Sequence, residues 1–192
     1  MTIRRIVLMG NPALQRVADP AANPRGADLA RLAEDMRETL ESIDANGLAA
    51  PQVEVPTRLV IYRVPAARIP KGAAQEPVPW TAMVNPILEP LSDQKTPIWE
   101  RCLSLPGLYG YVPRHNEIRL TFTDLDGVRH ERIAKGWHAM LIQHECDHLD
   151  GVLYPMRMTD MTKLTFASEL GDGKSFYSYS AEEFDGSRKG GP

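Results

Sequence analysis

Two histidines at helical spacing, with a glutamate between them, constrain this chain more than any other feature. His144 and His148 lie four residues apart, and Glu145 directly follows the first of them. The residues from about Lys135 to Leu149 repeat with a helical period, since one face would collect Trp137, Met140, Leu141 and His144. Residues at positions i and i+4 share a helix face, so both imidazoles can reach one metal ion. The sequence therefore predicts a helix that carries a metal site, with the Glu145 carboxylate within reach of a water molecule on the ion.

The histidine pair leaves open which residue supplies the third protein ligand that a catalytic metal site needs. Gly151 fits the order found in one class of zinc peptidases, but Tyr154 stands where that class requires a histidine. Other zinc peptidases use a glutamate on a later helix, and Glu169 is available for that role. Cys102 is a further candidate, because a thiolate is a strong ligand for iron or zinc. Spacing alone does not choose among these residues.

The remaining patterns predict an α+β fold, in which antiparallel sheets pack around the central metal-binding helix. A first helix should begin near Asp28, which is a plausible N-cap, and should end near Asn46 and Gly47. Alternating and β-branched residues predict strands at 58–63, 81–85, 117–123 and 130–133, with Pro86 stopping the second of them. Asp126 and Gly127 supply the chemistry of a hairpin turn. A last short helix is expected at about 160–170.

Composition excludes several classes of protein. The 192 residues carry a net charge of −3, so strong nucleic-acid binding is not expected. No apolar run approaches the ~20 residues that a membrane-spanning helix needs, and no signal peptide is recognisable, so we expect no membrane association and a cytoplasmic location. The two cysteines, Cys102 and Cys146, are too few for a disulfide framework. We expect one catalytic domain over residues 1–170 and a C-terminal extension over 171–192 that is flexible at its end.

Three segments in a fixed order resemble the motifs of the peptide deformylase family, GxGxAAPQ, EGCxS and HExDH. Residues 45–52 read ANGLAAPQ, residues 100–104 read ERCLS, and residues 144–148 read HECDH. The connecting segments 84–86 and 112–114 are also similar to the family, and the resemblance covers roughly residues 5 to 160. Two positions depart from the motifs, because Ala45 and Arg101 stand where the family has glycine.

The resemblance implies a peptide deformylase, a hydrolase that removes the formyl group from the N-terminal N-formylmethionine of nascent polypeptides and releases formate. Cys102, His144 and His148 would bind one Fe²⁺ ion per chain, which Zn²⁺, Ni²⁺ or Co²⁺ can replace, with water as the fourth ligand. Glu145 would act as general base and acid, while the Gln52 side chain and the Leu103 backbone N–H would hold the oxyanion.

The resemblance also implies contacts with the substrate and its source. Gly47 would let the peptide backbone approach and pair as an added strand. The apolar helix stripe suggests Met140 and Leu141, with Trp137, as a pocket for the methionine side chain. The expected partners are N-formylmethionyl nascent peptides, with the ribosome as a further candidate.

Two alternative functions follow from the departures and from the open third ligand. The substitutions at Ala45 and Arg101 are compatible with an inactive paralogue that binds peptides. A metallopeptidase of another class would use the histidine pair without Cys102. Around the site, we predict that Arg114 pairs with Glu100 or Asp147 and steadies the ligands. Cys146 lies about 200° around the helix from His144, so we expect it in the core and not on the metal.

Overall fold

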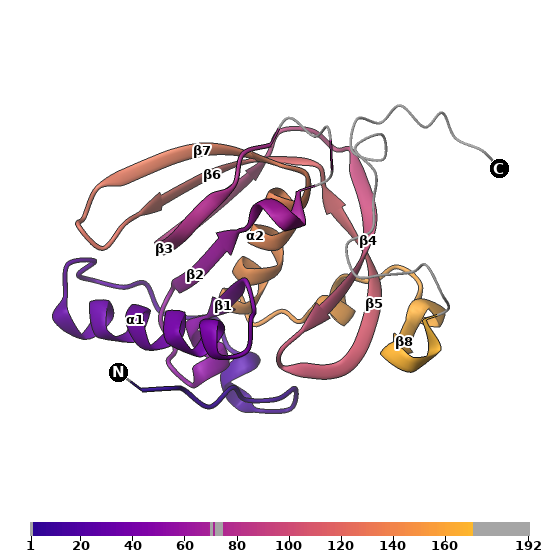
Figure 1. The fold of residues 1–192 in the computed structure, drawn as a ribbon, viewed down its shortest axis with the longest axis horizontal. Coiled ribbons are helices and arrows are strands. Elements are labelled where there is room, and N and C mark those ends of the chain that lie inside the picture. The colour runs from indigo at the N-terminus through magenta and orange to yellow at the C-terminus, as the bar shows by residue number, and fades with distance from the viewer. Residues whose placement is uncertain (1, 70, 72–74, 171–192) are drawn as a thin grey trace.

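Two antiparallel sheets and two α-helices make up the part of the chain that the computed structural model describes, residues 2–69, 71 and 75–170. The first sheet has the strand order β1 (Gly47–Ala49), β2 (Leu59–Val64), β3 (Val78–Pro90), β6 (Glu117–Thr123) and β7 (Arg129–Lys135). The second sheet has the order β4 (Lys95–Cys102), β5 (Leu105–His115) and β8 (Leu164–Phe166). Helix α2 (Gly136–Leu149) lies between the five-stranded sheet and the β4–β5 hairpin, and α1 (Ala27–Ser42) lies outside (Figure 1).

Strand β2 shows how the layers arise from the sequence. Its apolar residues are consecutive, and successive side chains of a strand point to opposite faces of the sheet. Val60 and Tyr62 belong to the core that includes the apolar residues of α2. Leu59 and Ile61 belong to a second core, which includes the apolar stripe of α1. The continuous apolar run is therefore the mark of a strand that is covered by a helix on each face.

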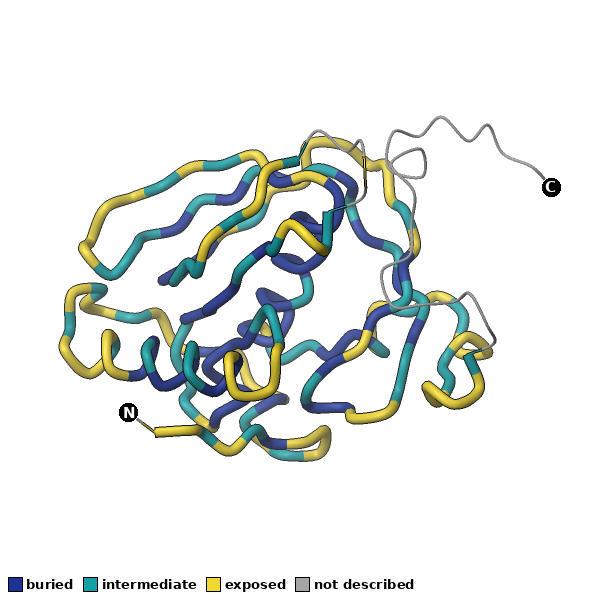
Figure 2. Tube along the Cα trace, viewed as in Figure 1, coloured by how far each residue is buried: buried dark blue, intermediate teal, exposed yellow. Residues whose placement is uncertain are grey.

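Helix α2 is the most buried element of the described chain, as the dark blue segment at the centre of Figure 2 shows. Of its residues, only His144 falls outside the buried class. The buried residues of α2 include polar and charged ones as well as apolar ones, namely His138, Gln143, Glu145, Asp147 and His148. The fold thus places His148 in the interior and leaves His144 half-buried beside it. None of the helices in the described residues is long and apolar enough to cross a membrane.

Several predicted elements are confirmed, and with them the α+β fold class. The predicted helix at 135–149 is α2, and the predicted strands at 58–63, 117–123 and 130–133 are β2, β6 and β7. Gly127 has a φ of 78° in the turn between β6 and β7, as the hairpin signal indicates. Each of these elements carries a hydrophobic pattern in its own residues, alternating in β6 and continuous in β2, so neighbouring residues were sufficient to predict them.

Three local predictions are wrong. The N-cap of α1 is Gly26 and not Asp28, which lies in the first turn of the helix. Strand β3 continues through Pro86, because Asn85 adopts a φ of 51° at a break in register and its side chain hydrogen-bonds the Ala21 backbone. A bulge of this kind needs no ladder N–H from the proline. The expected helix at 160–170 is instead β8 flanked by short turns, and β8 pairs with β5.

Strands β4 and β5 were not foreseen, because prolines interrupt them. Pro97 and Pro113 lie opposite each other in the β4–β5 register. The β4 strand is at the edge of its sheet, and β8 pairs with β5 only at residues 108–110. Neither proline therefore removes a ladder hydrogen bond that a third strand requires.

Short 3-10 turns complete the described chain: η1 (Pro12–Leu14), η2 (Ala50–Val53), η3 (Ala66–Arg68), η4 (Tyr154–Arg157), η5 (Met161–Lys163) and η6 (Ala167–Glu169). Two of them, η2 and η4, lie next to the site described below. The predicted C-terminal extension, residues 171–192, lies outside the described residues.

Candidate metal centre

Three side chains that prefer soft or borderline metal ions meet in the interior. Cys102 stands at the end of β4, whereas His144 and His148 lie one turn apart on α2. One ligand atom from each lies within 4.8 Å of the other two, and the Cys102 Sγ is 3.2 Å from the His148 Nε2. A thiolate and two imidazoles are a donor set that suits iron and zinc. The three residues therefore fit a metal ion.

The tight turn after β4 holds Cys102 in place. Cys102 pairs with Leu105 across this turn, and the Ser104 backbone N–H lies 3.4 Å from the Cys102 Sγ. The Ser104 carbonyl in turn accepts a hydrogen bond of 2.8 Å from Met9 N–H. An apolar cluster that includes Leu14, Leu105 and Tyr154 surrounds the sulfur. Backbone geometry, and not the flexible side chain alone, thus fixes the position of the thiol.

Hydrogen bonds also orient the His144 ring. Its Nδ1 lies 2.7 Å from a carboxylate oxygen of Glu100, so its Nε2 is the atom left for a metal. The ring stacks at 6.2 Å on Tyr154 and meets the His148 ring edge to face. A carboxylate behind a ligating histidine sets its tautomer and raises its basicity.

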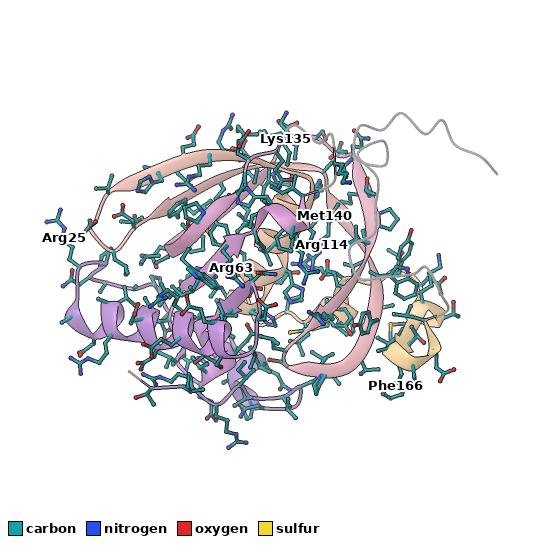
Figure 3. The ribbon with its side chains drawn as sticks, viewed as in Figure 1. Arg25, Arg63, Arg114, Lys135, Met140 and Phe166 are labelled. Atoms are coloured by element: carbon teal, nitrogen blue, oxygen red, sulfur yellow. The ribbon has the colours of Figure 1, made fainter. Side chains whose placement is uncertain are left out.

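Arg114 links this carboxylate to helix α2, as predicted. Its guanidinium lies 2.5 Å and 3.0 Å from the two oxygens of Glu100 and 2.6 Å from Asp147. It therefore pairs with both of the carboxylates that the sequence offered as alternatives. Asp147 also pairs with Arg157 of η4 at 2.7 Å. Arg114 lies between α2 and the β4–β5 hairpin (Figure 3), where it joins the two layers.

Buried charges shift the pKa values of the groups around the centre. Burial opposes ionisation of the Cys102 thiol, but the charges of His148 and His144 outweigh it and lower the thiol pKa to about 5. Burial likewise opposes the charge on Glu100, yet the Arg114 guanidinium holds the Glu100 pKa at about 2. The pKa of His144 is raised well above its usual value by Cys102 and Glu100, against the effect of burial. The site thus favours a thiolate, the form that binds a metal.

Glu145 lies next to the ligands in a pocket that Gly47 makes possible. Its Oε2 is buried and has no hydrogen-bond partner among the described residues. A Cβ added at Gly47 would overlap the Glu145 carboxylate, with the carboxyl carbon only 2.8 Å away. Burial raises the Glu145 pKa to about 7, in spite of the nearby histidines. A buried carboxyl group in this range can both accept and return a proton near neutral pH.

Gln52 points its amide nitrogen toward the sulfur. The first turn of η2 places the residue, and its Oε1 accepts a hydrogen bond of 2.9 Å from Ala49 N–H. Its Nε2 lies 3.5 Å from the Cys102 Sγ and 3.2 Å from the Ser104 hydroxyl. Leu103 follows Cys102 in the turn between β4 and β5. These two residues therefore stand beside the metal ligands.

A small pocket opens onto these groups from the surface. Its wall is formed by Ala45, Asn46, Gly47, Gln52, Arg68, Arg101, Cys102, Leu103, Trp137, Leu141, His144 and Glu145. Of the residues predicted to contact the substrate, Gly47 and Leu141 line this pocket, together with Trp137. Met140 is buried and is not among the lining residues.

Other candidates from the sequence lie elsewhere. Glu169, considered as a third ligand, is exposed in η6 and does not join the ligand group, so that alternative is wrong. Cys146 is buried in the core between α2 and the five-stranded sheet, as predicted. Sequence reasoning missed Tyr154, Arg157 and Arg68. The spacing of Tyr154 and Arg157 after the second histidine was a possible signal, whereas nothing local marks Arg68.

Comparisons with known proteins agree with this geometry. The family model described as polypeptide deformylase matches residues 3–164. Peptide deformylase 2 of Ralstonia nicotianae is 46% identical over 169 residues, which are 88% of this chain and 94% of that protein.

Solved structures with the same fold include peptide deformylase from Ehrlichia chaffeensis in complex with actinonin. It has a TM-score of 0.76 at 28% identity and covers 85% of this chain and 92% of that one. A Met-Ala-Ser bound class I type b peptide deformylase from Acinetobacter baumannii has a TM-score of 0.74 at 29% identity. The match covers 82% of this chain and 99% of that one.

Proposed function

Because the chain belongs to the polypeptide deformylase family, we propose that Cys102, His144 and His148 hold its catalytic metal ion. The protein is a metal-dependent hydrolase that removes the formyl group from the N-terminal formylmethionine of nascent polypeptides. The observation that carries the assignment of residues is the meeting of a thiol and two imidazoles beside the buried Glu145 carboxylate.

Iron(II) is the ion that we propose, and zinc, nickel or cobalt can replace it at the same ligands. One thiolate and two imidazoles suit each of these metals, so the ligands alone do not select iron. When bound, the ion polarises the formyl carbonyl and makes a water molecule nucleophilic at neutral pH. Metal analysis after anaerobic purification tests the choice, and zinc found in place of iron would contradict it.

Glu145 is the proposed proton carrier. Its carboxylate takes the proton of the attacking water and delivers it to the nitrogen of the methionine as the C–N bond breaks. The products are formate and a free amine. Support comes from the absence of a partner for the buried Oε2 among the described residues, and from the space that Gly47 leaves for the carboxylate.

Gln52 and Leu103 are the proposed hydrogen-bond donors to the oxyanion, which is the former carbonyl oxygen after water has added to the formyl carbon. The Gln52 Nε2 stands near the Cys102 sulfur, and the Leu103 backbone N–H belongs to the residue that follows this cysteine. Donors held in place before the reaction stabilise the developing charge without reorganising. The hydrogen bond between the Gln52 Oε1 and Ala49 keeps the amide in the orientation that this role requires.

The substrate peptide is proposed to bind as an extended strand between two sheet edges. Strand β1 is the edge of the five-stranded sheet, and β4 is the edge of the three-stranded sheet. Residues of both edges, Gly47 and Cys102 among them, line the same pocket. An added strand uses the unpaired backbone groups of such edges. The methionine side chain would then contact Trp137 and Leu141 in the pocket wall.

The place of action that we propose is the cytoplasm, close to ribosomes that synthesise formylated chains. Co-sedimentation with purified ribosomes tests whether the protein contacts the ribosome directly. Absence of the protein from the ribosomal pellet would limit its partners to the peptides themselves.

Formate release from formyl-Met-Ala by the iron-loaded protein tests the proposed chemistry. Glu145→Gln should retain the metal and lose activity by about 10²- to 10⁴-fold, because the proton carrier is gone. Cys102→Ala should lose the metal as well as the activity. Full turnover by Glu145→Gln would overturn the role of this residue. No turnover by the metal-loaded wild-type protein would favour an inactive peptide-binding paralogue.

A further inference from the structure

Two arginines stand at the entrance to the catalytic pocket. Arg68 is the last residue of η3, and Arg101 precedes Cys102 in β4, so they come from separate segments of the chain. Among the described residues that line the pocket, Glu145 is the one acidic residue, and its side chain is buried. Two guanidinium groups thus bring positive charge to the pocket wall, although the chain as a whole carries a net charge of −3.

Two further arginines near the site, Arg114 and Arg63, hold the fold together through ion pairs. Arg114 lies between Glu100 and Asp147 in the interior. Arg63 hydrogen-bonds Asp44 at 2.9 Å and Asn46 at 3.0 Å, which braces the segment before β1. Neither of these arginines lines the pocket. Arg68 and Arg101 thus differ from them by their position at the entrance.

Strand geometry sets which part of a substrate passes these arginines. In β4, Glu100 and Cys102 are buried while Arg101 between them is exposed, as alternation along a strand requires. One strand residue spans about 3.3 Å. If the formyl group lies at Cys102, an extended peptide carries its second and third residues past Arg101, within reach of a long side chain.

We propose that Arg68 and Arg101 form a carboxylate-binding subsite, which makes this protein prefer formylmethionyl peptides with an acidic side chain at the second or third residue. The proposal rests on the proposed function, because that function puts the formylated end at Cys102. A guanidinium offers several N–H donors in a planar fork that matches a carboxylate, and it can do so while keeping another contact. Two such groups around one pocket select for charge as well as for shape.

Four amide-capped peptides test the proposal without the complication of a terminal carboxylate. Formyl-Met-Asp-Ala is compared with formyl-Met-Asn-Ala, and formyl-Met-Ala-Asp with formyl-Met-Ala-Asn. Each pair differs in charge at nearly constant shape. The ratio of kcat/KM within a pair is measured for the wild-type protein, for Arg68→Gln and Arg101→Gln, and for the double variant. Arg119→Gln is the matched control, since this arginine lies on β6 and pairs with Glu89.

The wild-type protein should favour aspartate over asparagine about three- to tenfold in at least one pair, as expected for partly exposed ion pairs. Each single variant should lower the ratio, and the double variant should bring it to about one, whatever its absolute rate. Arg119→Gln should keep the wild-type ratio, and higher salt should reduce it. A ratio near one in both wild-type pairs, or an unchanged ratio in the double variant, overturns the proposal.

Failure of the subsite and failure of the function are distinguishable. Loss of the aspartate preference with continued formate release removes only the subsite. If no peptide releases formate, the deformylase chemistry fails, and calorimetric binding of the deformylated pair Met-Asp-Ala amide and Met-Asn-Ala amide decides the subsite instead. Tighter binding of the aspartate peptide that disappears in the double variant supports it, and equal binding overturns it.

Discussion

At the scale of single residues, position 47 requires glycine because a side chain there would overlap Glu145, and not because of its backbone conformation. Its φ is not among the positive values of the described glycines, so other residues could adopt its backbone shape. What a side chain cannot do is share the volume of the Glu145 carboxylate. The motif glycine thus serves the acid–base residue directly, in addition to the proposed approach of the substrate backbone.

Gly47→Ala should therefore reduce formate release by about 10²-fold, because displacing a catalytic group by ~1 Å has costs of this order. The three atoms nearest to the added methyl group all belong to Glu145 and none to a metal ligand, so metal content should match that of the wild-type protein. Formate release per bound metal is the measurement. Wild-type turnover in a well-folded Gly47→Ala protein would show that Glu145 needs no such space.

His138 gives a second prediction, which concerns stability and pH. Its ring hydrogen-bonds the Tyr62 hydroxyl at 3.2 Å, and burial, aided by the charge of Arg132, lowers its pKa to about 4. The unfolded chain, with a pKa of about 6.5, takes up the proton first as the pH falls. The contribution of neutral His138 is thus fully present above pH ~6.5 and is lost as the pH falls toward ~4.

Urea unfolding at pH 7.5 and pH 4.5 measures this contribution. The wild-type free energy of unfolding should fall between these values by about 2 kcal/mol more than that of His138→Gln. Other titrating groups affect both proteins, so the difference isolates His138. An equal fall in the two proteins would contradict the assignment.

At the scale of elements, a row of ion pairs ties the metal centre to the rest of the fold. Glu100 of β4, Arg114 of β5, Asp147 of α2 and Arg157 of η4 contact one another in sequence. The Arg114 side chain is 4% exposed and the Arg157 side chain is 48% exposed. The two arginines share the partner Asp147, but only one of them neutralises charge inside the protein.

Arg114→Gln should accordingly lower the free energy of unfolding by about 3–5 kcal/mol, because the buried Glu100 carboxylate loses its guanidinium partner and Asp147 keeps only Arg157. Arg157→Gln should lower it by no more than about 1 kcal/mol, since solvent screens its ion pair. Urea unfolding in the presence of a chelator measures both without a contribution from bound metal. Equal losses of unfolding free energy in the two variants would mean that burial does not decide how much each ion pair stabilises the fold.

At the scale of the whole molecule, the metal centre joins the two sheets. Cys102 belongs to the three-stranded sheet, and His148, 46 residues away along the chain, belongs to the helix that packs on the five-stranded sheet. An ion bound by both favours the native state, because the unfolded chain does not bring these ligands together. Metal binding should thus act on the stability of the entire fold.

Removal of the metal should lower the Tm by about 5–10 °C, which corresponds to the ~2.7 kcal/mol expected at a hundredfold excess over Kd. Thermal unfolding with and without a chelator measures the shift. Cys102→Ala should unfold at nearly the same temperature in both conditions. A full shift in that variant would place the stabilising metal at other ligands.

The fold was predictable in those elements whose own residues carry a clear hydrophobic pattern. Helix α2 and strands β2, β6 and β7 follow from their own side chains, since burial on one face or on both dictates the pattern. Strand β8 could not be predicted, because three residues carry too little pattern and β5 supplies the pairing. Strands β4 and β5 were not predicted because they contain prolines. A proline is tolerated where its position faces no neighbouring strand, and the sequence alone does not show which positions these are.

The sequence by itself determined the helix that carries two imidazoles on one face, the carboxylate between them, and three motifs in the order of a known family. The resemblance to that family implied Cys102 as the third ligand, and the tertiary structure showed that Cys102, and not Glu169, meets the histidines. Only the tertiary structure decided that Arg68 joins Arg101 in the pocket wall. The physical reason is distance along the chain. Spacing within one helix determines which side chains share a face. Whether residues from different strands and turns meet depends on how the sheets and helices pack together.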